Sequence, residues 1–281
     1  MDKNFVVKKH SGEQEEFNPA KLLSSLMRSG VDEGTAKLVM QELYEHLYDG
    51  ITTEQIYRKA FRLLQKKLRT SAARYSLKKA IMEMGPSGHP FEHLVGAIIG
   101  HLGYQFEVGV TFRGKCVSHE LDVLARNSHE MFMVECKYYN SQGKNCNVQV
   151  PLYINSRFND VKAVWELNPA NKGLKFSGWV VTNTRFSSDA ADYGKCAGLN
   201  LIGWDYPRGN SLRELIERYG LFPVTALTTL SKKQKDMLLG ANQVLCRQLL
   251  ENKAALGMLG LDKKDNQKVL NEIIELTGVQ P

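Results

Sequence analysis

Two carboxylates and a lysine stand out because they interrupt apolar, strand-like segments in the middle of the sequence. Asp122 lies in one such segment, and Glu135 and Lys137 lie near the end of the next one. Side chains alternate between the two faces of a strand, so Glu135 and Lys137 should project to the same side. A turn at 126–129 would pair the two segments as a hairpin and bring Asp122 beside Glu135.

Two neighbouring carboxylates repel each other, which drives one of them toward protonation unless a cation neutralises the pair. Oxygen ligands and a phosphate partner suit Mg²⁺, or Mn²⁺ in its place. Such a metal would lower the pKa of a bound water and stabilise the charge that grows on a phosphodiester, while Lys137 would orient the water or neutralise the transition state. The residues therefore predict metal-dependent phosphodiester hydrolysis. The alternative is a structural ion pair at a sheet end.

The order of Asp122 and then Glu135-x-Lys137 resembles the signature of the PD-(D/E)xK nucleases. Leu121 stands where the name of the signature has proline, a departure that is common in the superfamily. The resemblance implies that Asp122 and Glu135 bind the metal and that Lys137 joins them in catalysis.

The stretch upstream of these residues also resembles a known family. The helix-like segment 91–96 and the Leu-Gly-Tyr of 102–104 resemble the opening of the Mrr-like restriction endonuclease branch. The resemblance covers about residues 88–205 and implies a restriction-endonuclease-like α/β sheet domain that cleaves DNA in a restriction system. In that branch a Glu on the first helix joins the site, and Glu92 occupies the matching place. The implied catalytic residues are Glu92, Asp122, Glu135 and Lys137, and the three carboxylates are the implied metal ligands.

A basic segment near the N-terminus has the residue types that bind phosphate. Residues 5–9 read as a short strand, a turn follows at 11–12, and a second strand leads into a helix that begins near Lys21. Helix N-termini and nearby backbone N–H groups favour phosphate, and Lys9 and Lys21 would add charge-assisted hydrogen bonds. The sequence has no G-x-x-x-x-G-K-[ST] motif, so nothing indicates a P-loop.

This segment resembles the ATP-cone, the nucleotide-sensing module of ribonucleotide reductases and their repressor. The family motif is V-x-K-R-x-G, an acidic residue, and F-[ND]-x-x-K-[IL]; the matching residues are Val7, Lys9, Gly12, Phe17, Asn18 and Lys21. The resemblance spans residues 3–84 and implies ATP or dATP as an effector that is not hydrolysed. His10 stands where the family usually has Arg, and the alternative is a helical cap that has lost its ligand. The implied nucleotide-binding residues are Val7, Lys9, His10, Glu15, Asn18, Lys21 and Thr53.

The elements that must position these residues fall into three regions of an α/β protein. Residues 1–84 predict a mainly helical domain with a small β-hairpin, in which Thr53 caps a helix over 56–68. Residues 85–90 are rich in Gly and Pro and form the expected linker. Residues 88–221 predict a sheet domain because strand-like and helix-like runs alternate. The expected strands are 105–110, 121–125, 131–136, 178–181 and 199–203, and the expected helices are 91–102, 154–167 and 190–196.

Residues 222–281 form the third region and read as helices over 231–239, 243–250 and 266–276. The Lys-rich start of the first of these helices would suit a grip on a phosphate backbone. A solvated helical bundle or an oligomerisation element fits the same pattern. A homo-oligomer would suit a nuclease that cuts both strands of a duplex.

The composition of the 281-residue chain sets its broad class. Apolar residues make up 43% and charged residues 24%, which is ordinary for a soluble protein of about two domains at roughly 150 residues each. No run approaches the roughly 20 apolar residues of a membrane helix, and no signal-peptide apolar region follows Met1, so a cytoplasmic protein without membrane contact is expected. The net charge of +7 suits DNA, although a solvated lysine-rich surface gives the same value. Five cysteines without a C-x-x-C pair argue against a disulfide framework and a structural zinc site.

These patterns together predict a metal-dependent endodeoxyribonuclease that an adenine nucleotide regulates. Two alternatives stay open. One is a nucleotide-sensing, DNA-binding regulator whose nuclease domain is inactive. The other is a nuclease that acts on RNA or on a repair junction.

Overall fold

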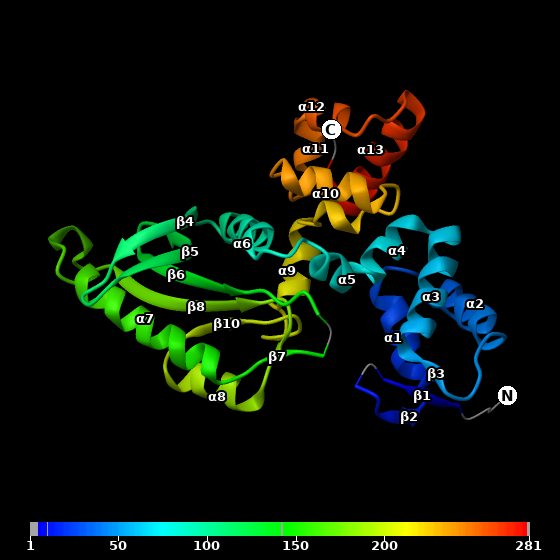
Figure 1. Cartoon of the computed structure of the whole chain (residues 1–281), viewed down its shortest axis with the longest axis horizontal. Helices are drawn as coiled ribbons and strands as arrows, with labels where there is room; N and C mark the ends of the chain where they lie inside the picture. Colours follow the sequence, from blue (N-terminus) through cyan, green and yellow to red (C-terminus); the bar gives the residue numbers. More distant parts are fainter. Residues whose placement is uncertain (1–4, 10, 142, 280–281) are drawn as a thin grey trace.

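The computed structural model describes residues 5–9, 11–141 and 143–279. Figure 1 shows a helical module with a small sheet at the N-terminus, a larger sheet domain in green and yellow, and a group of helices at the C-terminus in orange and red. The short helix α5 (Leu77–Met82) lies between the first two parts. The mixed α/β architecture expected from the sequence is confirmed.

The N-terminal module packs helices against a three-stranded sheet in the order β2-β1-β3. β1 (Val6–Lys8) pairs antiparallel with β2 (Gln14–Glu16) and parallel with β3 (Ile51–Thr52). Apolar side chains from the strands and helices form a core of their own, in which Leu26, Ala36 and Leu64 are fully buried. The helices are α1 (Pro19–Arg28), α2 (Glu33–Tyr44), α3 (Thr53–Lys67) and α4 (Arg69–Tyr75).

The cap of α3 differs from the expectation, because Thr52 and not Thr53 precedes the helix. The Thr52 hydroxyl accepts the backbone N–H of Gln55 at 3.1 Å, and the Gln55 side chain accepts the N–H of Thr52 at 2.9 Å. This reciprocal pair is a capping box, which satisfies two otherwise free donors. Thr53 is therefore the first helical residue, and its side chain is free for another role.

The central domain contains a five-stranded mixed sheet in the order β10-β8-β6-β5-β4. The first three strands in sequence pair antiparallel, and β8 and β10 continue the sheet in parallel from β6. Helix α6 (His89–His101) packs on one face, and α7 (Gln149–Trp165) and α8 (Ser188–Cys196) cover the other (Figure 1). The strands are β4 (Gln105–Arg113), β5 (Ser118–Arg126), β6 (Glu130–Lys137), β8 (Lys175–Thr182) and β10 (Asn200–Ile202).

Smaller elements close the ends of this domain. β7 (Asn145–Cys146) and β9 (Arg185–Phe186) form a two-stranded parallel sheet just beyond the ends of β6 and β8. A 3-10 turn, Pro169–Asn171, precedes β8. Helix α9 (Leu212–Tyr219) begins with a capping box between Ser211 and Glu214, and the sequence reading missed this helix.

The C-terminal helices share one continuous apolar core with α6, α9 and one face of the sheet. The middle helix of this region is shorter than expected, because the Gln248 side chain accepts the N–H groups of Val244 and Leu245 and holds that stretch out of a helix. Within the described residues, no helix is both long enough and apolar enough to cross a membrane. The elements are the 3-10 turn Val224–Ala226, α10 (Lys232–Gly240), α11 (Gln248–Glu251), α12 (Lys253–Gly257) and α13 (Lys263–Thr277).

Candidate active site

The hairpin of β5 and β6 forms as the sequence predicts. Val123 pairs with Val134 in the antiparallel register, so Asp122 and Glu135 occupy the next position along the two strands. The turn between the strands is fixed by Asn127, whose side-chain oxygen accepts the N–H groups of two following residues at 2.8 and 2.9 Å. The register brings two carboxylates that are 13 residues apart in sequence to one end of the sheet.

The regular alternation of side chains along strand β5 is interrupted at Asp122. Leu121 packs in the apolar cluster under α7, whereas Val123 packs in the cluster under α6. A regular strand would place these two residues on the same face. On β4, Gly109 lies between the residues that pair with Leu121 and Val123, and its φ of +70° is readily adopted only by glycine. This local distortion, of a kind common beside active sites, aims Asp122 at the sheet end.

Asp122 and Glu135 are each held by a specific donor. The backbone N–H of Cys136 donates to Asp122 Oδ2 at 2.6 Å. Arg157 on α7 donates to Glu135 Oε2 at 2.5 Å, and Glu135 is only 8% exposed. A second guanidinium nitrogen of Arg157 donates to the backbone carbonyl of Glu120 on β5. The arginine therefore ties helix α7 to both strands of the hairpin.

The sequence reading missed Arg157. The buried residues of α7 recur at helical spacing and include Ile154, Phe158 and Val161. Arg157 lies at the edge of this apolar stripe, three residues after Ile154. A cation at the rim of a buried face needs an acidic partner nearby. That pattern indicates that the arginine has a partner, but not which of the domain's carboxylates it is.

Burial raises the pKa of both carboxyl groups. Loss of solvent raises the pKa of Asp122 to about 6; the Cys136 N–H opposes the rise, and the charge of Glu92 adds to it. Loss of solvent raises the pKa of Glu135 to about 7, and the neighbouring Asp122 adds to it, while Arg157 and Lys137 oppose it. The pair therefore carries negative charge at a cost, which a further cation beside it would relieve.

Glu92 and Lys137 flank the pair without touching it. Glu92 lies in the first turn of α6, and its Oε2 is 3.5 Å from Nδ1 of His89 on the same helix. Lys137 ends β6 with an exposed side chain, and its backbone carbonyl accepts the Thr182 hydroxyl at 2.7 Å. The charge of Glu92 raises the pKa of both Asp122 and Glu135. Its side chain lies over its own helix end, beside Gly88.

The expected set of three carboxylate ligands is not assembled. Across residues 5–9, 11–141 and 143–279, no three His, Cys, Asp or Glu side chains lie close enough together to hold a metal ion. Asp122 and Glu135 alone fit a divalent cation, since both are oxygen ligands whose mutual repulsion a cation removes. Arg157 already supplies part of that positive charge to Glu135.

A second candidate site lies in the N-terminal module. A cavity of about 200 Å³ there brings together residues expected to bind nucleotide. Asn18 caps α1 by accepting the N–H of Lys21 at 3.1 Å, and Lys21 Nζ lies 3.8 Å from Glu15. Lys9 is not part of the wall but pairs with Glu15 at 2.8 Å. His10 lies outside the described residues. The expected residues in the wall are Val7, Glu15, Asn18, Lys21 and Thr53.

Two tyrosines that the sequence reading did not single out complete this cavity. The rings of Tyr57 and Tyr75 stack with their centres 5.2 Å apart and 12° between their planes. Tyr57 lies one helical turn after Thr53 on α3, a spacing that places the two side chains on one face. A flat aromatic wall beside polar and basic groups suits a nucleobase.

Comparison with known proteins places the last two regions of the chain. The family model for the Mrr-type catalytic domain, described as restriction endonuclease, matches residues 84–208. The model for the C-terminal part of AF1548-like proteins matches residues 222–277. The restriction-endonuclease domain expected from the sequence is thereby confirmed. The AF1548-like C-terminal part was not anticipated, and the ATP-cone stays a prediction.

Individual proteins are also similar to this chain. An uncharacterized protein of Archaeoglobus fulgidus is 32% identical over 177 residues, which cover 63% of this chain and 95% of that protein. The crystal structure of AF1548, a protein of unknown function, has 30% identity and a TM-score of 0.55 over 68% of this chain and 99% of that one. The MspJI restriction endonuclease, in complex with a 27-mer oligonucleotide, is more distant, with 14% identity and a TM-score of 0.34 over 60% of this chain and 35% of that one. The chain belongs to the AF1548-like family, and in this chain a restriction-endonuclease-type domain is followed by the AF1548-like C-terminal part.

Proposed function

We propose that the protein is a metal-dependent endonuclease that hydrolyses phosphodiester bonds of DNA. The observation that carries the proposal is the pair of Asp122 and Glu135. The half-buried Asp122 and the buried Glu135, both with a raised pKa, lie side by side at the end of a restriction-endonuclease-type sheet, with Lys137 next to them. Keeping two such groups together lowers the stability of the fold. Ionisable groups with strongly shifted pKa values cluster at functional sites, and this pair suits the binding of a cation and a phosphate.

Asp122 and Glu135 would hold Mg²⁺ or Mn²⁺, which supplies an activated water and neutralises charge on the phosphate when bound. The Cys136 N–H keeps one Asp122 oxygen fixed, and Arg157 fixes one oxygen of Glu135. Each carboxylate thus retains a second oxygen as a ligand. Lys137 projects from the same face of β6 as Glu135 and would contact the scissile phosphate. Glu92 adds negative charge from α6, which strengthens the attraction for a divalent cation.

The N-terminal module would bind ATP or dATP as an effector. Its cavity gathers five residues that the ATP-cone resemblance assigns to nucleotide binding and adds a stacked tyrosine pair. The cavity and the carboxylate pair are two distinct sites in one chain, as allosteric regulation requires. A role in restricting foreign DNA in the cytoplasm, carried out by an oligomer that cuts both strands, is consistent with this proposal.

Cleavage of plasmid DNA tests the proposal. The purified full chain is incubated with Mg²⁺ or Mn²⁺, with and without ATP or dATP, beside Glu135→Ala. We expect the wild type to nick or linearise the plasmid only when metal is present, and we expect Glu135→Ala to be inactive. Cleavage that survives at the wild-type rate in Glu135→Ala would rule out this site.

A second candidate function is a nucleotide-sensing regulator that binds DNA without cutting it. Arg157 favours it, because its guanidinium already pairs with Glu135 and competes with a metal ion for that carboxylate. In this case the wild type binds duplex DNA with an affinity that falls steeply with salt, and no metal produces cleavage. Cleavage of RNA or of branched DNA, but not of plasmid, would instead keep the nuclease and change its substrate.

A further inference from the structure

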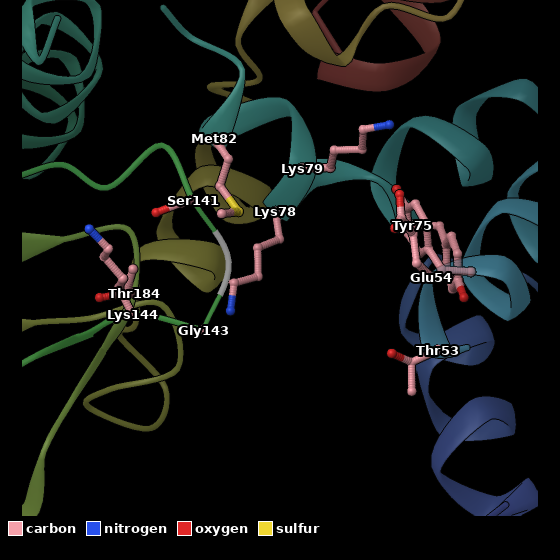
Figure 2. Close-up of a pocket in the computed structure, with 11 residues that line it drawn as sticks. Thr53, Glu54, Tyr75, Lys78, Lys79, Met82, Ser141, Gly143, Lys144 and Thr184 are labelled. Carbon is pink, nitrogen blue, oxygen red and sulfur yellow. The ribbon is translucent and has the colours of Figure 1, made fainter. Parts of the chain in front are cut away.

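A cavity of about 340 Å³ lies between the N-terminal module and the central domain (Figure 2). One wall comes from the module and from α5, with Thr53, Tyr75 and Lys78. The opposite wall comes from the central domain, with Lys144 in the loop after β6 and Thr184 after β8. A ligand in this cavity would contact both parts of the chain at once.

The cavity has an excess of positive charge. Within the described parts of the chain, neither Lys78 nor Lys144 forms an ion pair, whereas nearby Arg185 pairs with Asp205 at 2.7 Å. Lys78 extends from α5 toward the loop that carries Gly143 (Figure 2). Desolvation and the charge of Arg185 lower the pKa of Lys78, while the charge of Asp205 opposes the fall. The Lys78 ammonium lies 5.7 Å from the centre of the Trp204 ring and forms no ion pair among the described residues. The chemistry of the cavity therefore suits an anion.

This cavity adjoins the nucleotide cavity of the N-terminal module. Thr53, Tyr57 and Tyr75 line both of them. The nucleotide cavity measures about 200 Å³, which is below the roughly 300 Å³ at which small-molecule sites begin. The charges of Lys9 and Lys21 in and beside it are partly neutralised by Glu15. Lys78 and Lys144, which form no ion pair among the described residues, line the adjoining cavity on the other side of these shared residues.

The loop that contributes Ser141, Gly143 and Lys144 to the cavity wall also connects the elements of the candidate active site. It leaves β6 directly after Lys137 and leads to α7, which carries Arg157. The hydroxyl of Tyr138 at the start of the loop donates to the backbone carbonyl of Met82 on α5 at 2.7 Å. Asn183 holds Tyr139 through hydrogen bonds of 2.9 and 2.7 Å. Any ligand that restrains this loop therefore acts on β6, which carries Glu135, and on α7, which carries its partner Arg157.

We propose that the cavity between the module and the central domain binds the phosphates of the effector nucleotide. Lys78 and Lys144 contact the phosphates, while the base lies against Tyr57 and Tyr75. Occupancy links α5 to the loop after β6 and so transmits nucleotide binding to the carboxylate pair. The expected effect on DNA cleavage rests on the proposed function. The expected binding of nucleotide to the cavity does not depend on it.

Calorimetric titration of the full chain with ATP and with adenosine tests the phosphate site. The variant is Lys78→Gln with Lys144→Gln, and the matched control is Lys172→Gln with Lys195→Gln, which removes the same charge from exposed positions elsewhere. We expect the first variant to bind ATP at least ~10-fold more weakly and to bind adenosine as the wild type does. The control should bind both ligands normally, and thermal melting should show that both variants fold.

Three results would overturn the inference. The first is ATP affinity within twofold of the wild type in Lys78→Gln with Lys144→Gln. The second is loss of affinity for duplex DNA with ATP binding unchanged, which would assign the cavity to the DNA backbone. The third is a wild type that does not bind ATP.

Cleavage supplies the regulatory arm of the test. In the double variant, the ratio of plasmid cleavage rates with and without ATP should move to 1, whatever its value in the wild type. A ratio that stays at the wild-type value would contradict the coupling. A wild type that cuts no DNA would defeat the proposed function, and the ATP titrations would still decide whether the cavity binds phosphate.

Discussion

The two candidate sites of this protein hold their charges in opposite ways. In the central domain, Glu135 is 8% exposed and is fixed by an arginine from another element. In the N-terminal module, the Lys21 side chain is 70% exposed and meets Glu15 only loosely at 3.8 Å. Charges removed from water interact strongly and are costly to leave unpaired, whereas solvated pairs contribute little. Single substitutions should therefore have large effects at the sheet end and small ones in the module.

The largest effect is expected for Glu135→Gln. The amide keeps an oxygen for Arg157, so the fold should persist, but one ligand charge is lost from the site. We expect the rate of metal-dependent cleavage to fall at least ~1,000-fold. Single-turnover plasmid cleavage measures the change, and Glu166→Gln is the control, because Glu166 is an exposed residue directly after the end of α7. A rate within threefold of the wild type would remove Glu135 from the site.

Arg157→Met tests how much the buried ion pair of Arg157 and Glu135 contributes to stability. Loss of the guanidinium leaves Glu135 unpaired, and we expect a loss of roughly 3 kcal/mol in the free energy of unfolding at pH 8 without metal. The matched variant Arg58→Met breaks an exposed pair with Glu54, and it should cost less than about 1 kcal/mol. Urea unfolding measures both, and equal losses would contradict the contrast between the two regions. Because Arg157 competes for Glu135, added Mg²⁺ should recover more stability in Arg157→Met than in the wild type.

The pH dependence of stability offers a third test. Burial raises the pKa values of Asp122 and Glu135 to about 6 and about 7, above the roughly 4 of unfolded carboxyls. The folded state therefore binds more protons than the unfolded state, and stability without metal should fall as pH rises from about 4 to about 7. For each of the two groups the slope is at most about 1.4 kcal/mol per pH unit.

Urea unfolding between pH 4 and 8 measures this slope, with and without Mg²⁺. Saturating metal should stabilise the protein at pH 8 and should have little effect at pH 5, where the pair is protonated. Asp122→Asn should flatten the metal-free profile. A metal effect of equal size at both pH values would show that the cation binds elsewhere.

A smaller effect is expected in the nucleotide cavity. Lys21→Gln removes a mainly solvated charge, so ATP affinity should fall only about fivefold. Calorimetric titration measures the change, and Lys37→Gln on α2, paired with Glu33 away from the cavity, is the control. A fall of several hundredfold would show that the bound state buries Lys21 much as the sheet end buries Glu135.

The smallest effect concerns the cap of α3. Thr52→Ala removes the hydroxyl of the capping box and should cost about 1 kcal/mol of stability. Thr53→Ala should cost clearly less, since its side chain does not cap the helix. Thermal melting of the two variants compares them, and the reverse order would contradict the observed cap. Thr53→Ala should instead weaken ATP binding, because Thr53 lines the cavity.

Local patterns in the sequence predicted much of the fold and the central pair of the candidate site. The strands of the hairpin, its turn at Asn127 and the placement of Asp122 beside Glu135 follow from alternation and turn chemistry over fewer than 20 residues. The helix expected over 243–250 begins only at Gln248, because the Gln248 side chain accepts the N–H groups of Val244 and Leu245. Hydrophobic spacing does not reveal such competition for backbone donors.

Motifs in the sequence were enough to predict which residue types lie at the two candidate sites, because a motif reflects chemistry that a few side chains must supply. Tertiary structure alone decided that Arg157 from α7 pairs with Glu135, and that Glu92 stays over its own helix. It also decided that Lys78 and Lys144, 66 positions apart, face one cavity with Thr53 between two domains. Each of these contacts depends on how whole elements pack, and packing across long sequence separations leaves no local periodicity to read.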